Sequence, residues 1–259
     1  MKLKLLFMII IGFTLNVDAY SNVKKPNNLM DFKKEPVLFA LNDTYKKELN
    51  HKDLFALKER TLKLAGKSVP VLINVMKSSD YPDKNRWIAT FLLGRIVGKK
   101  AAPFIAKFSK HPSWVLRMAS LKTLLALKQS DYGPVYAEAL GDSSLLVRIQ
   151  ALENIKGLKL KSYGSRVWAM LYDQQNYYNV KNVYKRTNII KNVIKTVGDL
   201  ELQEAKKPLL VMINDKKYDD IFEEMDYSLG RLTGKSSPKG EKVNKRQFWK
   251  RVSLAETKI

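Results

Sequence analysis

Three arginines, Arg86, Arg117 and Arg148, recur at equal intervals of thirty-one positions, and a proline follows each of the first two at the same offset, at Pro103 and Pro134. A period of this length is too long for a coiled-coil heptad, but it suits one pair of helices joined by short turns. A chain with this period buries the apolar face of each pair against the next pair. The period therefore predicts a stack of helical hairpins.

The residues that follow each arginine predict one helical face. At offsets of three, seven and ten the three copies carry, in turn, Ala89, Ser120 and Ala151, then Leu93, Leu124 and Ile155, then Ile96, Leu127 and Leu158. These offsets fall on the same side of an α-helix. The second helix of each pair is expected to begin near the proline, because a missing N–H costs nothing in a first turn. The small residues should let helices approach closely, and the large ones should fill the seam between pairs.

Further copies of the repeat are present with drift. One second helix is expected to open at Pro70, and Arg186 is interpreted as the head of a later pair, at a longer interval from Arg148 than the regular period. The longer spacing places an insertion in residues 173–180. We therefore expect repeats on both sides of the three aligned copies.

The sequence LGRIVGK at residues 93–99 recurs as LGRLTGK at residues 229–235. Glycine followed by lysine, here and at Gly66, is interpreted as the turn that ends a first helix. Glycine adopts the left-handed conformation of a helix end, and lysine favours the negative end of the helix dipole. A phosphate-binding loop at residues 230–236 is rejected, because that motif needs four residues between its glycines and a strand before them.

The segment DSSLLVRIQAL at residues 142–152, the two Leu-Gly-Arg segments and their spacing resemble the HEAT-like repeat family. The likeness is greatest to the short bacterial repeats shared with phycobilisome-lyase-type proteins, and it covers roughly residues 50–235. The resemblance implies an all-α fold, a right-handed α-solenoid of about five to six helical hairpins. It also implies a surface used mainly for binding proteins, with no catalytic motif attached to the family.

Residues 1–19 have the pattern of a signal peptide. Residues 1–4 are basic, residues 5–15 are almost wholly apolar, and Val17 and Ala19 are small residues at the positions read by a signal peptidase. Eleven apolar residues would span about 16 Å, well short of the roughly 30 Å of a bilayer core. An export signal is therefore preferred to a transmembrane or buried helix, and no transmembrane helix is expected after cleavage. We expect the mature chain in the periplasm or outside the cell.

The rest of the chain is divided by composition. Residues 20–36 are polar and interpreted as a flexible linker, residues 37–235 as the repeat solenoid, and residues 236–259 as a basic C-terminal tail or cap. A hydrophobic content of 45% with 12 glycines and 9 prolines favours a helical core over many short strands. The chain has no cysteine, so neither a lipid-modified cysteine nor a disulfide is available.

Catalytic patterns are weak. His51 and His111 are the only histidines and fall in different repeats, which does not support a zinc site or a histidine-activated nucleophile. The acidic residues of 219–226 are interpreted as the solvated face of an amphipathic helix whose inward side carries Ile221, Phe222 and Met225, in preference to a cation site. Ser236 and Lys239 have a serine–lysine spacing in a Ser-Pro-Gly loop too loose for a nucleophile. We assign no catalytic residue, no metal ligand and no cofactor, and predict that the chain is not an enzyme.

Charge is the feature that points to a partner. The net charge is +22, and residues 84–130 carry ten lysines or arginines and no acid, whereas residues 199–226 carry nine acids and four lysines. Several lysines fall near the turns between paired helices and predict a basic ridge: Lys67, Lys99, Lys100, Lys128, Lys159, Lys161 and Lys235. The alternative is general lysine enrichment for solubility. A field of this size speeds encounter with anions without choosing among them.

A second candidate contact surface lies at the insertion. Tyrosines alternate there with basic residues: Tyr172, Tyr177, Tyr178, Tyr184, Lys181, Lys185 and Arg186. Tyrosine and arginine are common in interface hot spots, although tyrosines buried in a repeat would give the same pattern. The candidate partner-binding residues are therefore Lys67, Lys99, Lys100, Lys128, Lys159, Lys161, Tyr177, Tyr178 and Lys181.

Two functions remain open. The first is an exported, non-enzymatic scaffold that binds another protein with an acidic surface. The second is a charge-driven binder of an anionic envelope polymer or membrane surface, with nucleic acid disfavoured because an export signal separates the chain from cellular DNA. Ionic strength distinguishes them, since dispersed charge pairs weaken as the Debye length falls from about 10 Å at 0.1 M to about 3 Å at 1 M salt.

Overall fold

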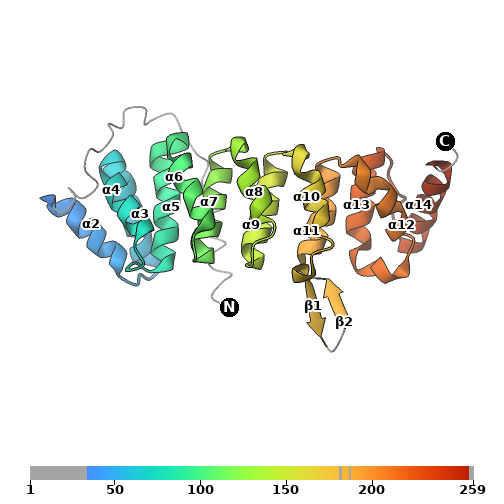
Figure 1. The fold of residues 1–259 in the computed structure, drawn as a ribbon, viewed down its shortest axis with the longest axis horizontal. Helices are drawn as coiled ribbons and strands as arrows, with labels where there is room; N and C mark the ends of the chain where they lie inside the picture. Colours follow the sequence, from blue (N-terminus) through green and yellow to red (C-terminus); the bar gives the residue numbers. More distant parts are fainter. Residues whose placement is uncertain (1–33, 181–182, 187, 257–259) are drawn as a thin grey trace. The chain divides into compact units, whose positions relative to one another are not determined.

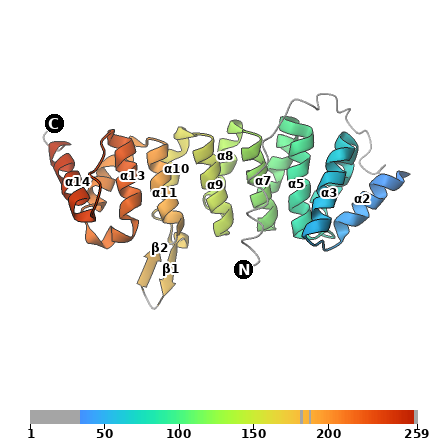
Figure 2. The same cartoon turned by 180° about the vertical axis from the view of Figure 1, so that it is seen from behind.

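The computed structural model describes residues 34–180, 183–186 and 188–256 and separates into two compact units, Met1–Gln129 and Ser130–Ile259. Each unit is a row of short antiparallel helices joined by tight turns, as Figures 1 and 2 show from opposite sides. The predicted all-α class, an α-solenoid of helical pairs, is confirmed. The handedness of the superhelix stays a prediction.

In unit 1 the chain forms α2 (Pro36–Lys46), α3 (His51–Leu64), α4 (Val69–Lys77), α5 (Asp83–Val97), α6 (Ala102–Ala106) and α7 (Trp114–Ala126), with the 3-10 turns η2 (Ala65–Ser68), η3 (Gly98–Ala101) and η4 (Lys107–Lys110). Pro70 and Pro103 lie in the first turns of α4 and α6, as predicted. Asn50 caps α3 by accepting a hydrogen bond from the Asp53 N–H at 3.0 Å.

In unit 2 the chain forms α8 (Gly133–Ala139), α9 (Leu145–Gly157), α10 (Gly164–Ala169), β1 (Tyr177–Val180), β2 (Val183–Arg186), α11 (Asn188–Asp199), α12 (Lys206–Met212), α13 (Phe222–Thr233) and α14 (Lys242–Glu256). The 3-10 turns are η5 (Ser130–Tyr132), η6 (Lys161–Tyr163), η7 (Gln174–Asn176), η8 (Gln203–Ala205) and η9 (Lys216–Ile221). Pro134 lies in the first turn of α8, again as predicted. No helix in the described part of the chain has both the length and the apolar character to cross a bilayer.

The predicted helical face forms the core. Eight of the nine aligned positions are buried, and Leu158 is half-buried. Small residues allow close approach: a Cβ on Gly198 of α11 would lie 2.7 Å from the Ser228 Cα of α13. The Ser228 hydroxyl also donates to the Ile194 carbonyl at 2.7 Å. Small residues therefore allow α11 and α13 to approach closely in this unit.

The turns that end the first helices use a left-handed residue. Gly98 and Gly234 both have φ of +67° at the ends of α5 and α13, which confirms the helix-end interpretation for these two glycines. Gly66 lies in the turn η2 after α3, as interpreted, but the residue with positive φ at the end of α3 is Ala65, at +47°. Lys128, Lys159 and Glu201 take the same role after α7, α9 and α11, with φ of +53°, +53° and +56°.

These last three residues also correct the repeat register. Each is followed by an N–H that bonds a carbonyl five positions earlier, and the interval from Lys159 to Glu201 is eleven positions longer than that from Lys128 to Lys159. The position equivalent to Arg148 is therefore Ile190, which is 1% exposed, and not Arg186. Arg186 instead ends β2, which pairs antiparallel with β1. The eleven extra residues hold a β-hairpin, which the sequence did not predict.

Candidate binding surfaces

The regularly spaced arginines join loops. Arg148 donates through Nη1 to the Asp142 carbonyl at 2.6 Å, in the loop before its own helix, and through Nη2 to the Gln175 carbonyl at 3.0 Å, in the loop before the next first helix. Its Nε donates to the Asn176 Oδ1 at 2.9 Å, and the residue is 3% exposed. A side chain so fully engaged is not available to a ligand. The expected structural role is therefore confirmed for Arg148.

Arg86 joins the end of α4 to the loop that contains His111, and Arg117 holds the loop before its own helix. Arg86 is 4% exposed, donates to the Met76 carbonyl at 3.2 Å and lies with Nη2 3.1 Å from the His111 Nε2. Arg117 donates to the His111 and Pro112 carbonyls at 2.9 and 2.8 Å. The arginine row therefore stabilises the loops between pairs.

The loops share a second contact at the same spacing. His111, Asp142 and Asp173 each accept a hydrogen bond from the N–H two positions later, at 3.0, 2.8 and 2.9 Å. The pKa of His111 is held below its usual value of 6.5, chiefly by burial and next by the Arg86 guanidinium. His111 is thus a structural loop residue in this geometry.

The turn lysines of unit 1 face solvent. Lys67 lies in η2, Lys99 and Lys100 lie in η3, and Lys128 ends α7; all four are exposed. Because paired helices run antiparallel, the turn between α3 and α4, the turn between α5 and α6, and the end of α7 lie along one edge of the unit (Figure 1). Among the residues that the structure describes, none of the four forms an ion pair with a carboxylate. We call Lys67, Lys99, Lys100 and Lys128 the turn lysines.

The corresponding edge of unit 2 is partly neutralised. Lys161 pairs with Glu201 at 2.6 Å, and Arg231 lies 3.9 Å from the same carboxylate. The hydrogen bond from Lys161, followed by the attraction of its charge, lowers the pKa of Glu201. Lys159 and Lys235 are exposed near this edge. The predicted ridge is therefore interrupted by an acid at the turn position that carries lysine after α7 and α9.

The aromatic candidate surface falls on the hairpin. Tyr177 opens β1 and is half-buried, with its hydroxyl donating to the Leu171 carbonyl at 2.6 Å. Tyr178 is the next residue of β1, and its backbone pairs with Lys185 of β2. Lys181 lies outside the described residues. Figures 1 and 2 show the hairpin projecting from the loop side of α10 and α11. Its role in binding stays a prediction.

The acidic run has a structural use that the sequence did not indicate. Ile221, Phe222 and Met225 are buried as predicted, but the acids are not simply a solvated face. Lys245 of α14 lies 2.7 Å from the Glu223 carboxylate and 3.0 Å from that of Asp226, whose side chain is 14% exposed. Basic and acidic stretches far apart in the sequence thus hold α14 against η9 and α13.

Two further side chains of α14 complete this attachment. The indole N–H of Trp249 donates to Asp226 at 2.6 Å, and Trp249 is fully buried. Arg246 pairs with Asp219 and donates through Nε to the Ile213 carbonyl at 2.9 Å. The acids of residues 219–226 are therefore not only a solvated face, because they lie against α14, which carries complementary charge and the buried Trp249.

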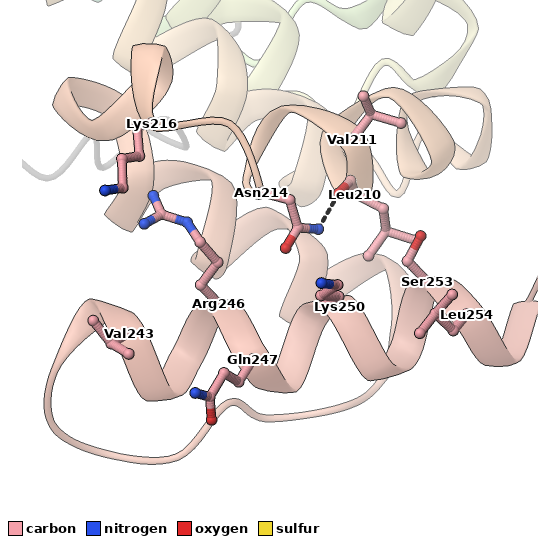
Figure 3. A pocket seen from close by; sticks show the side chains of 10 residues that line it. All are labelled: Leu210, Val211, Asn214, Lys216, Val243, Arg246, Gln247, Lys250, Ser253 and Leu254. Carbon is pink, nitrogen blue, oxygen red and sulfur yellow. Dashed lines mark hydrogen bonds between the residues drawn. The ribbon is translucent and has the colours of Figure 1, made fainter.

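A pocket of about 550 Å³ lies between α12 and α14 on unit 2. It is lined by Leu210, Val211, Asn214, Lys216, Val243, Arg246, Gln247, Lys250, Ser253 and Leu254, which we call the C-terminal pocket (Figure 3). Leu210 is buried at 3%, whereas Val211, Val243 and Leu254 are 70%, 57% and 57% exposed. The lining combines apolar side chains with three cations and no carboxylate.

The sequence missed the C-terminal pocket. Its available signal was α14 itself, where Val243 and Leu254 interrupt an otherwise polar outer face while Trp249 points inward. That pattern shows apolar residues outside the buried stripe. It does not show that α12 supplies the opposite wall, because this depends on how α14 folds back.

The described residues hold no group of three or more acids or histidines placed to bind a metal ion. His51 begins α3 and His111 lies in the loop after η4, both in unit 1. Ser236 and Lys239 are exposed in the segment between α13 and α14. The structure thus brings no catalytic arrangement together at the described residues that the sequence singled out.

Residues 69–156 match the family described as HEAT repeats. The match includes Arg86, Arg117 and Arg148 and ends within α9. It supports a HEAT-like repeat architecture, whose common use is a scaffold for protein interaction. No curated protein matches the chain.

Proposed function

We propose that this chain is an exported, non-enzymatic scaffold of the short bacterial, phycobilisome-lyase-like repeat type that binds an acidic surface of another protein. The observation that carries the proposal is the set of turn lysines, four exposed cations on one edge without carboxylate partners in the described part of the chain. Where cations lie near acids in this protein, as at Lys161 and Lys245, they pair. Unpaired cations in a row attract an external anion.

Export to the periplasm or the cell exterior rests on residues 1–19, which lie outside the described residues. If they form a leader, the purified mature chain begins at Tyr20. Mass spectrometry of the protein expressed from its complete coding sequence in a bacterial host tests this directly. An intact Met1 in a cytoplasmic fraction would contradict export.

The runner-up is binding to an anionic envelope polymer or membrane surface, favoured by the same unpaired lysines. A protein partner is preferred because residues 69–156 match a repeat family used mainly for protein contacts. Unit 1 also exposes large apolar side chains, Val37, Phe39 and Phe55, which are 50%, 56% and 58% exposed. A protein interface buries such side chains, whereas a hydrophilic polyanion gains nothing from them. They therefore favour a protein over an anionic polymer, but they do not separate a protein from a membrane surface.

The test is a pull-down from envelope extract with the chain carrying Lys67→Glu, Lys99→Glu, Lys100→Glu and Lys128→Glu. The matched control carries glutamate in place of four exposed lysines that lie away from these turns, Lys52, Lys107, Lys207 and Lys239. We expect the first variant alone to lose a specific protein partner, and the wild type to retain it from about 0.1 to 1 M salt.

Equal loss of the partner in both variants would mean that binding depends on net charge and not on the turn lysines. Recovery of glycan or lipid alone, released by salt, would favour the runner-up. If one protein is recovered equally by the wild type and by the first variant, its contact lies on another surface.

A further inference from the structure

The C-terminal pocket is a second surface with its own chemistry. Figure 3 shows Asn214 between the two helices, with Arg246 and Lys250 extending from α14 and Lys216 from the segment that follows α12. The Asn214 amide donates to the Leu210 carbonyl at 2.7 Å, which leaves its Oδ1 buried without a partner among the described residues. An apolar floor therefore meets polar and cationic walls within one pocket.

Only some of the charged side chains that line the pocket form ion pairs. Arg246 is held by Asp219, but Lys216 and Lys250 form no ion pair with the described residues. None of the ten lining residues is acidic. The charge that complements this rim is negative.

The apolar side chains set the shape of the ligand. Val243 and Leu254 are eleven residues apart on α14, which is about three helical turns or about 16 Å. Val211 lies on α12, on the other wall, and Leu210 closes the floor. Val211 on α12 and Val243 and Leu254 on α14 thus flank a lining that also carries Arg246 and Lys250. A groove that combines apolar and cationic side chains in this way suits an amphipathic helix.

Other occupants fit less well. A second copy would bring one cationic rim against another. The segment 20–33 of this chain carries three lysines and one aspartate, which gives it the same sign as the rim. A membrane surface needs several large apolar groups to insert, but the tryptophan of α14 is fully buried against the rest of unit 2.

We propose that the C-terminal pocket binds an amphipathic helix of a partner protein, with apolar side chains facing Leu210, Val211 and Leu254 and carboxylates facing Lys216 and Lys250. This site is independent of the turn lysines. It gives the scaffold a second contact at the C-terminal end of unit 2.

The test uses the full chain expressed from its complete coding sequence and a labelled peptide of about 15 residues, about the length of α14. The peptide has leucines at helical spacing on one face and glutamates on the other. Fluorescence anisotropy should show saturable binding. Hydrogen exchange should show new protection within residues 206–216 and 242–254.

Two variants separate the two parts of the pocket. Lys216→Glu with Lys250→Glu should weaken binding about tenfold or more, and Val211→Ser with Leu254→Ser should do the same through lost apolar contact. All four side chains line the pocket and are exposed, so folding should be preserved. Far-UV circular dichroism checks this.

The controls are a peptide with lysine in place of glutamate, a peptide with serine in place of leucine, and the fourfold turn-lysine variant. The two peptides should bind about tenfold more weakly or worse, and the turn-lysine variant should bind the acidic peptide as the wild type does. Loss of binding in that variant would place the peptide on the turn lysines and overturn the proposal.

Absence of saturable binding would overturn it as well. So would binding of phosphatidylglycerol vesicles that is lost in the pocket variants while the peptide fails to bind, because the occupant would then be a membrane surface. Concentration-dependent dimerisation lost in the same variants would instead assign the pocket to a second copy.

Discussion

In unit 1 the turn lysines face solvent without carboxylate partners among the described residues. Neutral hydrogen bonds join the first helices of this unit. Tyr81 donates to the Asn42 Oδ1 at 2.7 Å, and the Asn74 amide donates to the same oxygen at 3.0 Å. In unit 2, by contrast, Lys161, Lys245 and Arg246 are paired with acids. The comparison teaches that one repeat architecture can be closed by neutral or by charged contacts. The turn lysines of unit 1 are then left available to a partner.

The largest expected effect comes from removing the anchor of α14. Trp249→Ala should destabilise unit 2 by about 3–5 kcal/mol, because a fully buried indole leaves a cavity and Asp226 loses a donor. Hydrogen exchange should show lost protection in α12 to α14 and little change in α2 to α5. Equal loss in both units would show that they unfold as one.

Breaking the charged closure should have a smaller effect. Lys245→Ala should cost about 1–3 kcal/mol, since its side chain is 16% exposed and bonded to two carboxylates. The bond to Glu223 raises the pKa of Lys245 above its usual 10.5. The stabilisation is therefore complete below pH 10.5 and is lost as the pH rises through the folded-state pKa. Urea unfolding of both proteins at pH 8 and above pH 10.5 checks the sign.

The neutral closure of unit 1 should respond differently to salt. Tyr81→Phe should cost about 1 kcal/mol, because a buried hydroxyl bonded to Asn42 and Asn74 is removed. The loss should be the same at about 0.1 and 1 M salt, whereas that of Lys245→Ala should shrink as ions screen the pair. Equal salt dependence would erase the distinction between the two closures.

The left-handed turns offer a matched change in both units. Lys128→Gly and Lys159→Gly should each stabilise the chain by about 0.5–1 kcal/mol, because both lysines have φ of +53°. The corresponding alanine variants should give no gain, since alanine has the same steric cost. Thermal unfolding measures both. A loss with glycine would mean that these lysines make contacts that outweigh the strain.

The smallest effect concerns His111 of unit 1. Its pKa lies below 6.5, so the unfolded chain binds a proton more readily than the folded one. Stability from this group is present above pH 6.5 and is lost as the pH falls from 6.5 toward the folded-state pKa. His111→Gln should reduce the decline in urea midpoint between pH 7 and 5. An unchanged decline would assign it to other groups.

The fold could be read from spacing because a helical pair must place its small, large and proline residues at fixed offsets. Ala89, Ser120 and Ala151 are all fully buried, and the prolines open second helices as expected. Arg186 gave the wrong register because, as the next arginine after Arg166, it is interpreted as the repeat arginine, whereas the equivalent position, Ile190, carries no arginine. Glu201 corrects it through backbone conformation, which the residue type does not reveal.

The candidate surfaces could be predicted less well, because they depend on which charges meet. The turn lysines were found from their place beside helix-ending turns. The sequence does not show that Glu201 interrupts the predicted ridge in unit 2, nor that α14 folds back onto the acids of residues 219–226. Pairing between segments well separated in the sequence, such as Glu223 with Lys245, is a tertiary event, and the C-terminal pocket follows from it.

The hairpin of residues 177–186 shows where this repeat can be lengthened. Asp173, Gln175 and Asn176 keep the loop geometry and the bonds to Arg148, and α11 resumes the left-handed turn pattern at Glu201 after eleven extra residues. The hydrogen bonds of Arg148 hold the loop just before the insertion, so the inserted residues leave the neighbouring helices in place. For protein engineering, this loop is a ready graft site, and the equivalent loops held by Arg86 and Arg117 should accept foreign segments in the same way.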